Sequence, residues 1–180
     1  MGSNFQMAGK WIFVVECDPN WTPCEKAQVR SKVAEMNTMT PMQHDPAYSP
    51  AVRAQGDSCA AAWDREFAAR RARRSTPQSP LLGNDPNNHP NGGTDSDYAD
   101  PCMKDEVGEL EPAAQQQYIN SLQPDHTHEL QFGGSPQGPM RYMSGRVNGS
   151  LGGQLSGAGT RPDGSQGNSV DEFQVDASCK

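Results

Sequence analysis

The sequence contains no long hydrophobic run. Hydrophobic residues make up 33% of the chain and the mean hydropathy is −0.83, below the usual share for a globular protein. No apolar stretch approaches the roughly 20 residues needed to span a bilayer. The apolar run Trp11–Val15 is too short for the core of a signal peptide, and no cleavage site follows it. We therefore expect a small core, no membrane span and no cleavable signal peptide.

Positive charge is also scarce, since the formal net charge is −7 and the isoelectric point is about 5.0. This balance argues against nonspecific nucleic-acid binding through charge alone, although it leaves room for a locally basic cleft. The acidic excess is concentrated in residues 84–111, which hold eight Asp or Glu residues and one lysine. The remainder of the chain is therefore close to neutral.

Cysteines are few and irregularly spaced. There are five, and no two of them form a Cys-x-x-Cys pair, which argues against a structural zinc site. One or two disulfides would indicate an oxidising compartment, and the sequence leaves open whether they form. The odd count leaves at least one thiol free.

Glycine and proline are abundant, with 18 and 15 residues, and predict many turns and few long elements. The firmest local prediction is a helix at 23–38, because Thr22-Pro23-Cys24-Glu25 has the form of a capping box with proline at the first helical position. Apolar and turn residues predict four further elements, namely a buried strand at 10–17, helices at 60–74 and 112–122, and a short strand at 170–175.

These elements predict a small, loop-rich α+β single domain, mainly α with short strands. The chain divides into four parts: a tag or disordered segment at 1–9, a helical part with one strand at 10–74, an acidic loop or linker at 75–105, and a catalytic part at 106–180. Four arginines end the predicted 60–74 helix. They either match the helix dipole or contact phosphate.

The residues with the clearest chemical potential lie between Asp125 and Gln154. His126 and Glu129 would share one face of a helical turn and meet around a water molecule or a metal ion. An imidazole with a pKa near about 6.5 is suited to take a proton from water. Glu129 would orient His126 or, together with it, hold a divalent cation such as Mg²⁺. His128 competes for either role.

The residues that follow suit an anionic substrate. Gly133 and Gly134 would bring backbone N–H groups close to an anion, and Arg141 and Arg146 offer forked donors for phosphate. Neutral donors would come from Asn148, Ser150 and Gln154. The alternative interpretation is that this glycine-rich and asparagine-rich sequence is simply loop.

The order of these residues resembles the type 15 nuclease domain of bacterial polymorphic toxins, whose pattern is His-x-x-Asp, then Gly-Gly-x-Pro, then Asn-Ser-Ser-Ile-Gly-Ser-Gln. The corresponding residues here are His126-x-x-Glu129, Gly133-Gly134-Ser135-Pro136 and Asn148-Gly149-Ser150-Leu151-Gly152-Gly153-Gln154. The resemblance covers about 30 of the 180 residues. Glutamate replaces the family aspartate, and Leu155 replaces the aromatic residue that follows the glutamine.

The resemblance implies a metal-dependent nuclease, acting on DNA rather than RNA, that is secreted as an antibacterial effector. Such toxins are delivered into the cytoplasm of a recipient cell by a secretion apparatus such as type VI, and a cognate immunity protein neutralises them. In this setting His126 would be the general base and Glu129 the metal ligand.

Other functions fit parts of the sequence. A non-catalytic adaptor or binding protein of a secretion system would account for the acidic charge and the polar segments. A toxin hydrolase acting on cell-wall or NAD-type substrates could use the same imidazole. A nucleophilic Cys24 or Cys102 is a further possibility, but no partnered base accompanies either residue in the sequence.

Overall fold

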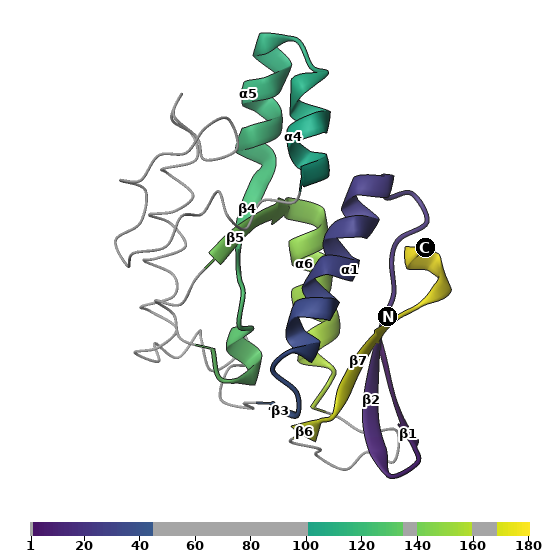
Figure 1. Ribbon diagram of the computed structural model, residues 1–180. Helices are drawn as coiled ribbons and strands as arrows, with labels where there is room; N and C mark the ends of the chain where they lie inside the picture. The colour runs from purple at the N-terminus through teal and green to yellow at the C-terminus, as the bar shows by residue number, and fades with distance from the viewer. Residues whose placement is uncertain (1, 45–100, 135–139, 160–168) are drawn as a thin grey trace.

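The computed structural model describes residues 2–44, 101–134, 140–159 and 169–180. Over these residues the chain is the small, mainly helical α+β protein with short strands that the sequence predicted (Figure 1). The predicted helix at 60–74, its arginines, Cys59 and most of the 75–105 segment lie outside the described residues.

A three-stranded sheet joins the two ends of the chain. β1 (Ser3–Met7) pairs antiparallel with β2 (Lys10–Val15), and β2 pairs in parallel with β7 (Glu172–Val175). Residues 1–9 were expected to be a tag or disordered. Instead, a two-residue turn with φ of 51° at Ala8 and 79° at Gly9 folds β1 back onto β2, because positive φ at both turn residues matches the twist of a hairpin.

Helix α1 (Pro23–Asn37) confirms the firmest sequence prediction. The Thr22 hydroxyl accepts a hydrogen bond from the Glu25 N–H, and the Glu25 carboxylate accepts one from the Thr22 N–H at 2.9 Å, which completes the capping box. Val29 and Val33 are buried in the main hydrophobic core. The helix is thereby fixed both at its N-terminal end and along its inner face.

Helix α6 (Gly145–Ser156) was not predicted. Val147, Leu151 and Leu155 recur every four residues and are all buried, so they form the inner face of the helix. α1 and α6 lie side by side near the three-stranded sheet (Figure 1). The core that they share with the sheet includes Phe13, Val15, Val29, Val33, Met36, Val147, Leu151, Leu155, Val170 and Phe173.

Two helices project from the other end of the molecule (Figure 1). They are α4 (Pro101–Gly108) and α5 (Pro112–Ser121), the second of which was predicted. Tyr118 of α5 donates a hydrogen bond of 2.7 Å to Glu106 of α4. Met103 belongs to a second small core with Cys24, Leu122 and Tyr142.

A two-stranded antiparallel sheet follows α5 and was not predicted. It consists of β4 (Leu122–His126) and β5 (Met140–Ser144), in a register that places Asp125 opposite Arg141 and His126 opposite Met140. The shorter elements are β3 (Met42–Gln43), the 3₁₀ turn η4 (Leu130–Phe132), β6 (Ser169–Val170) and the 3₁₀ turn η5 (Ala177–Cys179). β3 and β6 pair with each other.

Two disulfides answer the question that the cysteine count left open. Cys17 bonds to Cys179, and Cys24 bonds to Cys102. The first joins the end of β2 to the C-terminal turn, and the second joins α4 to the first turn of α1. In the described parts of the chain, no helix has the length and apolar character that crossing a bilayer requires.

Candidate functional site

The His-x-x-Glu segment lies where β4 ends. His126 is the last residue of β4 and its side chain is 4% exposed, whereas Glu129 precedes η4. The two residues therefore stand at a strand end and at the start of a 3₁₀ turn, not on one helical turn as the sequence spacing suggested. What brings the segment to α1 is a set of contacts that Lys32 makes with it.

Lys32 of α1 is the centre of this site. Its ammonium group lies 3.0 Å from the Asp125 carboxylate and 3.2 Å from the Glu129 carboxylate, and it also donates to the backbone carbonyl of His126. The lysine side chain is fully buried. Because a buried ammonium group is stable only when it is paired, these contacts fix the His126–Glu129 segment against the helix.

Arg141 brings a second buried cation to the site from β5. Its Nε lies 3.5 Å from the Asp125 carboxylate, and its Nη1 lies 3.4 Å from both Glu35 Oε2 and Ser31 Oγ. Its Nη2 is buried and has no hydrogen-bond partner among the residues that the structure describes, and the same holds for the hydroxyl of Thr127. Arg141 therefore keeps one donor for an acceptor outside these contacts.

The site combines two cations with three carboxylates, those of Asp125, Glu129 and Glu35. Burial raises the pKa of Glu129 and the nearby Asp125 raises it further, whereas Lys32 acts in the opposite direction. Burial alone would lower the pKa of Lys32, but the Asp125 and Glu129 carboxylates raise it above its ordinary value. Perturbed titratable groups of this kind are typical of functional sites, although structural ion pairs produce them too.

The glycine pair makes a turn, and its N–H groups are engaged. The Gly133 N–H donates to Leu130 O and the Gly134 N–H donates to Glu129 O, both at 3.1 Å, so neither presents a free N–H to an anion as the sequence suggested. Gly133 has φ of +86°, and a Cβ on Gly134 would lie 2.1 Å from His128 O. Both positions therefore favour glycine for reasons of backbone geometry.

His128 folds back onto the same turn. Its Nε2 lies 3.1 Å from the backbone oxygen of Phe132. This contact holds the imidazole of His128 against η4. His126 is buried, and it contacts Lys32 through its backbone carbonyl.

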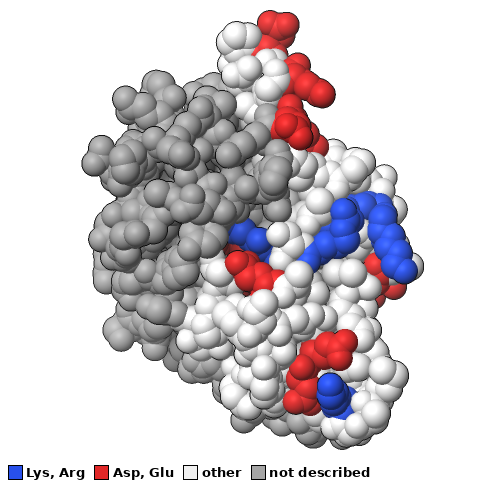
Figure 2. All heavy atoms as spheres, viewed as in Figure 1, with Lys and Arg blue, Asp and Glu red and all other residues white. Residues whose placement is uncertain are grey.

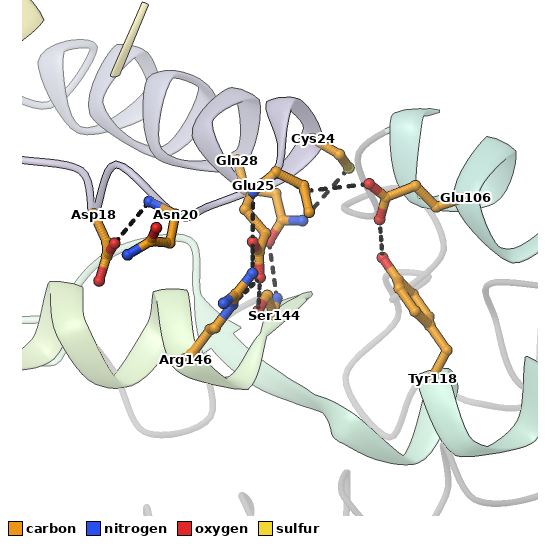
Figure 3. Close-up of polar contacts among 10 residues, drawn as sticks. Asp18, Asn20, Cys24, Glu25, Gln28, Glu106, Tyr118, Ser144 and Arg146 are labelled. Atoms are coloured by element: carbon orange, nitrogen blue, oxygen red, sulfur yellow. Dashed lines mark hydrogen bonds and ion pairs between the residues drawn. The ribbon is translucent and has the colours of Figure 1, made fainter. Parts of the chain in front are cut away.

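Arg146 lies at a different point along α1. Its guanidinium pairs with both oxygens of Glu25, with Nε at 2.6 Å from Oε1, and Ser144 Oγ donates to the same Oε1 at 2.8 Å (Figure 3). Glu25 precedes Lys32 by seven residues, a separation of about 10 Å along a helix. The structure thus separates Arg146 from the Lys32 contacts.

The other substrate-binding residues predicted on α6 make structural contacts. The Asn148 amide donates to Gln123 Oε1 at 3.3 Å, and the Gln154 amide donates to Ser150 Oγ and to the backbone of Glu16. Gln154 also accepts from the Glu16 N–H at 2.9 Å. These hydrogen bonds attach α6 to β4 and to the end of β2.

Three residues of the site were absent from the sequence prediction, namely Lys32, Asp125 and Glu35. Gln28, Lys32 and Met36 recur every four residues on α1, and all are buried. The four-residue spacing places Lys32 on the same helix face as Met36, and this spacing could have indicated a buried cation. Asp125 immediately precedes His126, but only the register of β4 with β5 shows that it faces Arg141.

The residues present do not fit the magnesium ion predicted at His126 and Glu129. The Lys32 ammonium group already lies between the carboxylates of Asp125 and Glu129. Across residues 2–44, 101–134, 140–159 and 169–180, no group of three or more His, Cys, Asp or Glu side chains is placed to hold a metal ion. A divalent cation would therefore have to displace the lysine.

Comparison with known proteins yields no relative. No protein-family model, no curated protein and no solved structure matches this chain. The resemblance to the type 15 nuclease domain therefore rests on the ordered motifs of residues 126–154 alone.

Proposed function

We propose that this chain hydrolyses phosphodiester bonds of nucleic acid, with DNA favoured over RNA. The observation that carries the proposal is the buried charge cluster at the end of β4. Lys32 contacts the Asp125 and Glu129 carboxylates and the backbone carbonyl of His126, and Arg141 approaches the same Asp125 carboxylate. An imidazole, a carboxylate with a raised pKa and an arginine with an unused donor are the groups that such a reaction requires. The order of the motifs, which resembles a nuclease family, supports the same function.

Each group has a defined role in this proposal. His126 takes a proton from the attacking water as the water oxygen bonds to phosphorus. The bond from phosphorus to the leaving sugar oxygen breaks, and the imidazolium returns the proton to that oxygen. Glu129 orients the segment that carries the imidazole. Arg141 donates from Nη2 to a phosphate oxygen, since a guanidinium group suits phosphate geometry. Lys32 keeps its place between the carboxylates and stabilises the negative charge that develops on the phosphate.

The biological setting follows from the resemblance. In this proposal the chain is an antibacterial effector that a secretion apparatus delivers into the cytoplasm of a recipient cell, where nucleic acid is its substrate. A cognate immunity protein neutralises it in the producing cell. The immunity protein is tested separately. The chain is co-expressed with a small neighbouring gene, and complex formation and loss of toxicity are measured.

Plasmid nicking by purified protein tests the activity. We expect His126→Ala to reduce nicking by at least about 100-fold, the usual contribution of a general base. His128→Ala is the matched control and should retain activity, because His128 contacts the Phe132 backbone. Equal nicking by wild type and His126→Ala would overturn the assignment. Parallel reactions with magnesium and with a chelator decide whether a divalent cation takes part.

A non-catalytic adaptor is the second candidate, and one observation favours it. Exposed acidic side chains gather on the projecting α4–α5 end of the molecule, shown at the top of Figure 2. A folded protein that nicks neither DNA nor RNA, yet binds a basic partner through this end, would establish the adaptor. A hydrolase of cell-wall substrates would instead be toxic when expressed in the periplasm and harmless in the cytoplasm.

A further inference from the structure

A small basic hollow lies beside α1, on the side that faces the C-terminal turn. It has a volume of about 170 Å³ and is lined by Trp21, Pro23, Lys26, Arg30 and Lys180. Figure 2 shows Lys and Arg side chains gathered in this part of the molecule, well apart from the acidic α4–α5 end. Three of the five lining residues are cations, although the whole chain carries a net charge of −7.

The hollow is built on a fixed framework. Lys180 follows Cys179, which the disulfide to Cys17 ties to the end of β2. Asp176 caps the C-terminal turn by accepting from the Ser178 N–H at 2.8 Å. One nitrogen of the Arg30 guanidinium donates to the backbone oxygen of Cys179. The backbone that carries Lys180 is therefore fixed at the hollow, and Arg30 contacts it directly.

The charge of the hollow favours an anion. Lys26 and Arg30 are one helical turn apart on the same face of α1, so their side chains reach the same space. Asp176 caps the C-terminal turn, and its hydrogen bonds with Ser178 lower its pKa. Acidic side chains lie next to the basic ones in Figure 2, but the residues that line the hollow itself carry three positive charges, and Trp21 supplies a rigid apolar wall.

The hollow is separate from the buried charges around Lys32. Arg30 and Lys32 are two residues apart on α1 and so point to opposite sides of the helix. A ligand in the hollow therefore lies across the width of the helix from His126. A single small anion in the hollow would therefore not contact the buried charges around Lys32.

We propose that this hollow binds a backbone phosphate of a nucleic-acid strand, outside the position where cleavage takes place. The choice of a nucleic-acid strand rests on the proposed function, whereas the preference for phosphate rests on the three cations that line the hollow. Lys26, Arg30 and Lys180 neutralise the phosphate, and binding releases counterions from the strand. The site adds affinity without reading sequence.

Salt-dependent binding tests the inference. The full chain with His126→Ala is titrated with a fluorescent single-stranded DNA in chelator, so that binding is measured without cleavage. We expect Lys26→Gln and Lys180→Gln each to weaken binding and to reduce the slope of log Kd against log salt by about 0.7, the value for one lost phosphate contact on a single strand. Lys10→Gln, which removes an exposed lysine of β2, is the matched control and should leave the slope unchanged.

Each result of the binding titration either supports the phosphate site or overturns it. Weaker binding with a smaller slope in both hollow variants, but not in Lys10→Gln, supports the site. Unchanged binding, equal losses in all three variants, or no binding by the parent protein at low salt overturns it. Loss of plasmid nicking is a separate readout, so a protein that binds through the hollow and cleaves nothing would refute only the proposed function.

Discussion

At the scale of single residues, Lys32 has the largest expected effect on stability. Replacing it with methionine leaves the Asp125 and Glu129 carboxylates buried without their cation. Breaking a buried ion pair in this way lowers the free energy of unfolding by about 3–5 kcal/mol. Urea denaturation of Lys32→Met at pH 7, followed by circular dichroism, measures the loss.

The pH dependence of Lys32→Met distinguishes the loss of stability that comes from charge from the loss that comes from packing. Burial raises the pKa of Glu129, so this carboxylate takes up a proton as the pH falls, and the deficit of Lys32→Met relative to wild type should shrink below pH 7. Adding Glu129→Gln to the variant should recover part of the loss at pH 7, because an amide is cheaper to bury than a carboxylate. Wild-type stability in Lys32→Met would show that the lysine is not buried among these carboxylates. Lys10→Met serves as the control.

The contacts of Glu25 predict a second dependence of the stability on pH. Burial acts to raise the pKa of Glu25, but its hydrogen bonds with Arg146, Thr22 and Ser144 outweigh burial and lower the pKa below the ordinary value of 4.5. A lowered pKa in the folded state gives stability that is present above about pH 4.5 and is lost as the pH falls through the folded pKa. Glu25→Gln should therefore be less stable at pH 7, by roughly 1 kcal/mol.

The deficit of Glu25→Gln should diminish as the pH falls below about 4.5, and urea denaturation at several pH values follows it. Glu109→Gln is the control, because Glu109 is exposed. A deficit that stays constant down to pH 2 would mean that the Glu25 charge contributes nothing to stability.

At the scale of elements, the glycines of residues 126–154 fall into two groups. A Cβ at Gly149, inside α6, would meet nothing within 4 Å, whereas a Cβ at Gly134 would lie 2.1 Å from a backbone oxygen. Gly149→Ala should stabilise the protein by about 0.5–1 kcal/mol, because alanine loses less conformational entropy in a helix. Gly134→Ala should destabilise it, since the backbone must move. Thermal unfolding of both variants measures whether each substitution raises or lowers the stability. A loss of stability in Gly149→Ala would contradict the helix.

Helices were predicted correctly from the sequence where a single local motif marks where the helix begins. The capping box at Thr22 and Glu25 located α1, and a proline at the first position located α5. Sequence reasoning failed at α6, because four glycines hid the four-residue spacing of Val147, Leu151 and Leu155. The two strands of the β4–β5 sheet were missed as well, since Pro124 lies in the first and a long connection separates them.

At the scale of the whole molecule, the disulfides supply stability that the small core does not. The Cys17–Cys179 bond closes a loop with a sequence separation of 162 residues. Removing such a bond lowers the free energy of unfolding by about 2–5 kcal/mol, mainly because the unfolded chain gains freedom. Urea unfolding of Cys17→Ala/Cys179→Ala measures this loss. Equal stability of the double variant and the oxidised wild type would contradict the bond.

The candidate site shows why only part of it could be predicted. The sequence singled out His126, Glu129 and Arg141 because their residue types and spacing are visible along the chain. Lys32 comes from a helix more than 90 residues earlier, and its approach to Asp125 depends on long-range packing. Arg146 and Gln154 were assigned to the substrate, yet they hold α6 in place, because polar residues in a row do not reveal which way a helix turns them.

The parallel pairing of β2 with β7 determines when the protein can fold. Val15 lies beside Val175, so the central strand of the sheet lacks one neighbour until residue 175 has left the ribosome. At about 5–20 residues per second, translation of the intervening 160 residues takes roughly 8–30 s. During that interval the hairpin of β1 and β2 exposes an unpaired edge. A chaperone, or a partner strand in the producing cell, therefore has a defined period in which to capture the nascent chain before the sheet closes.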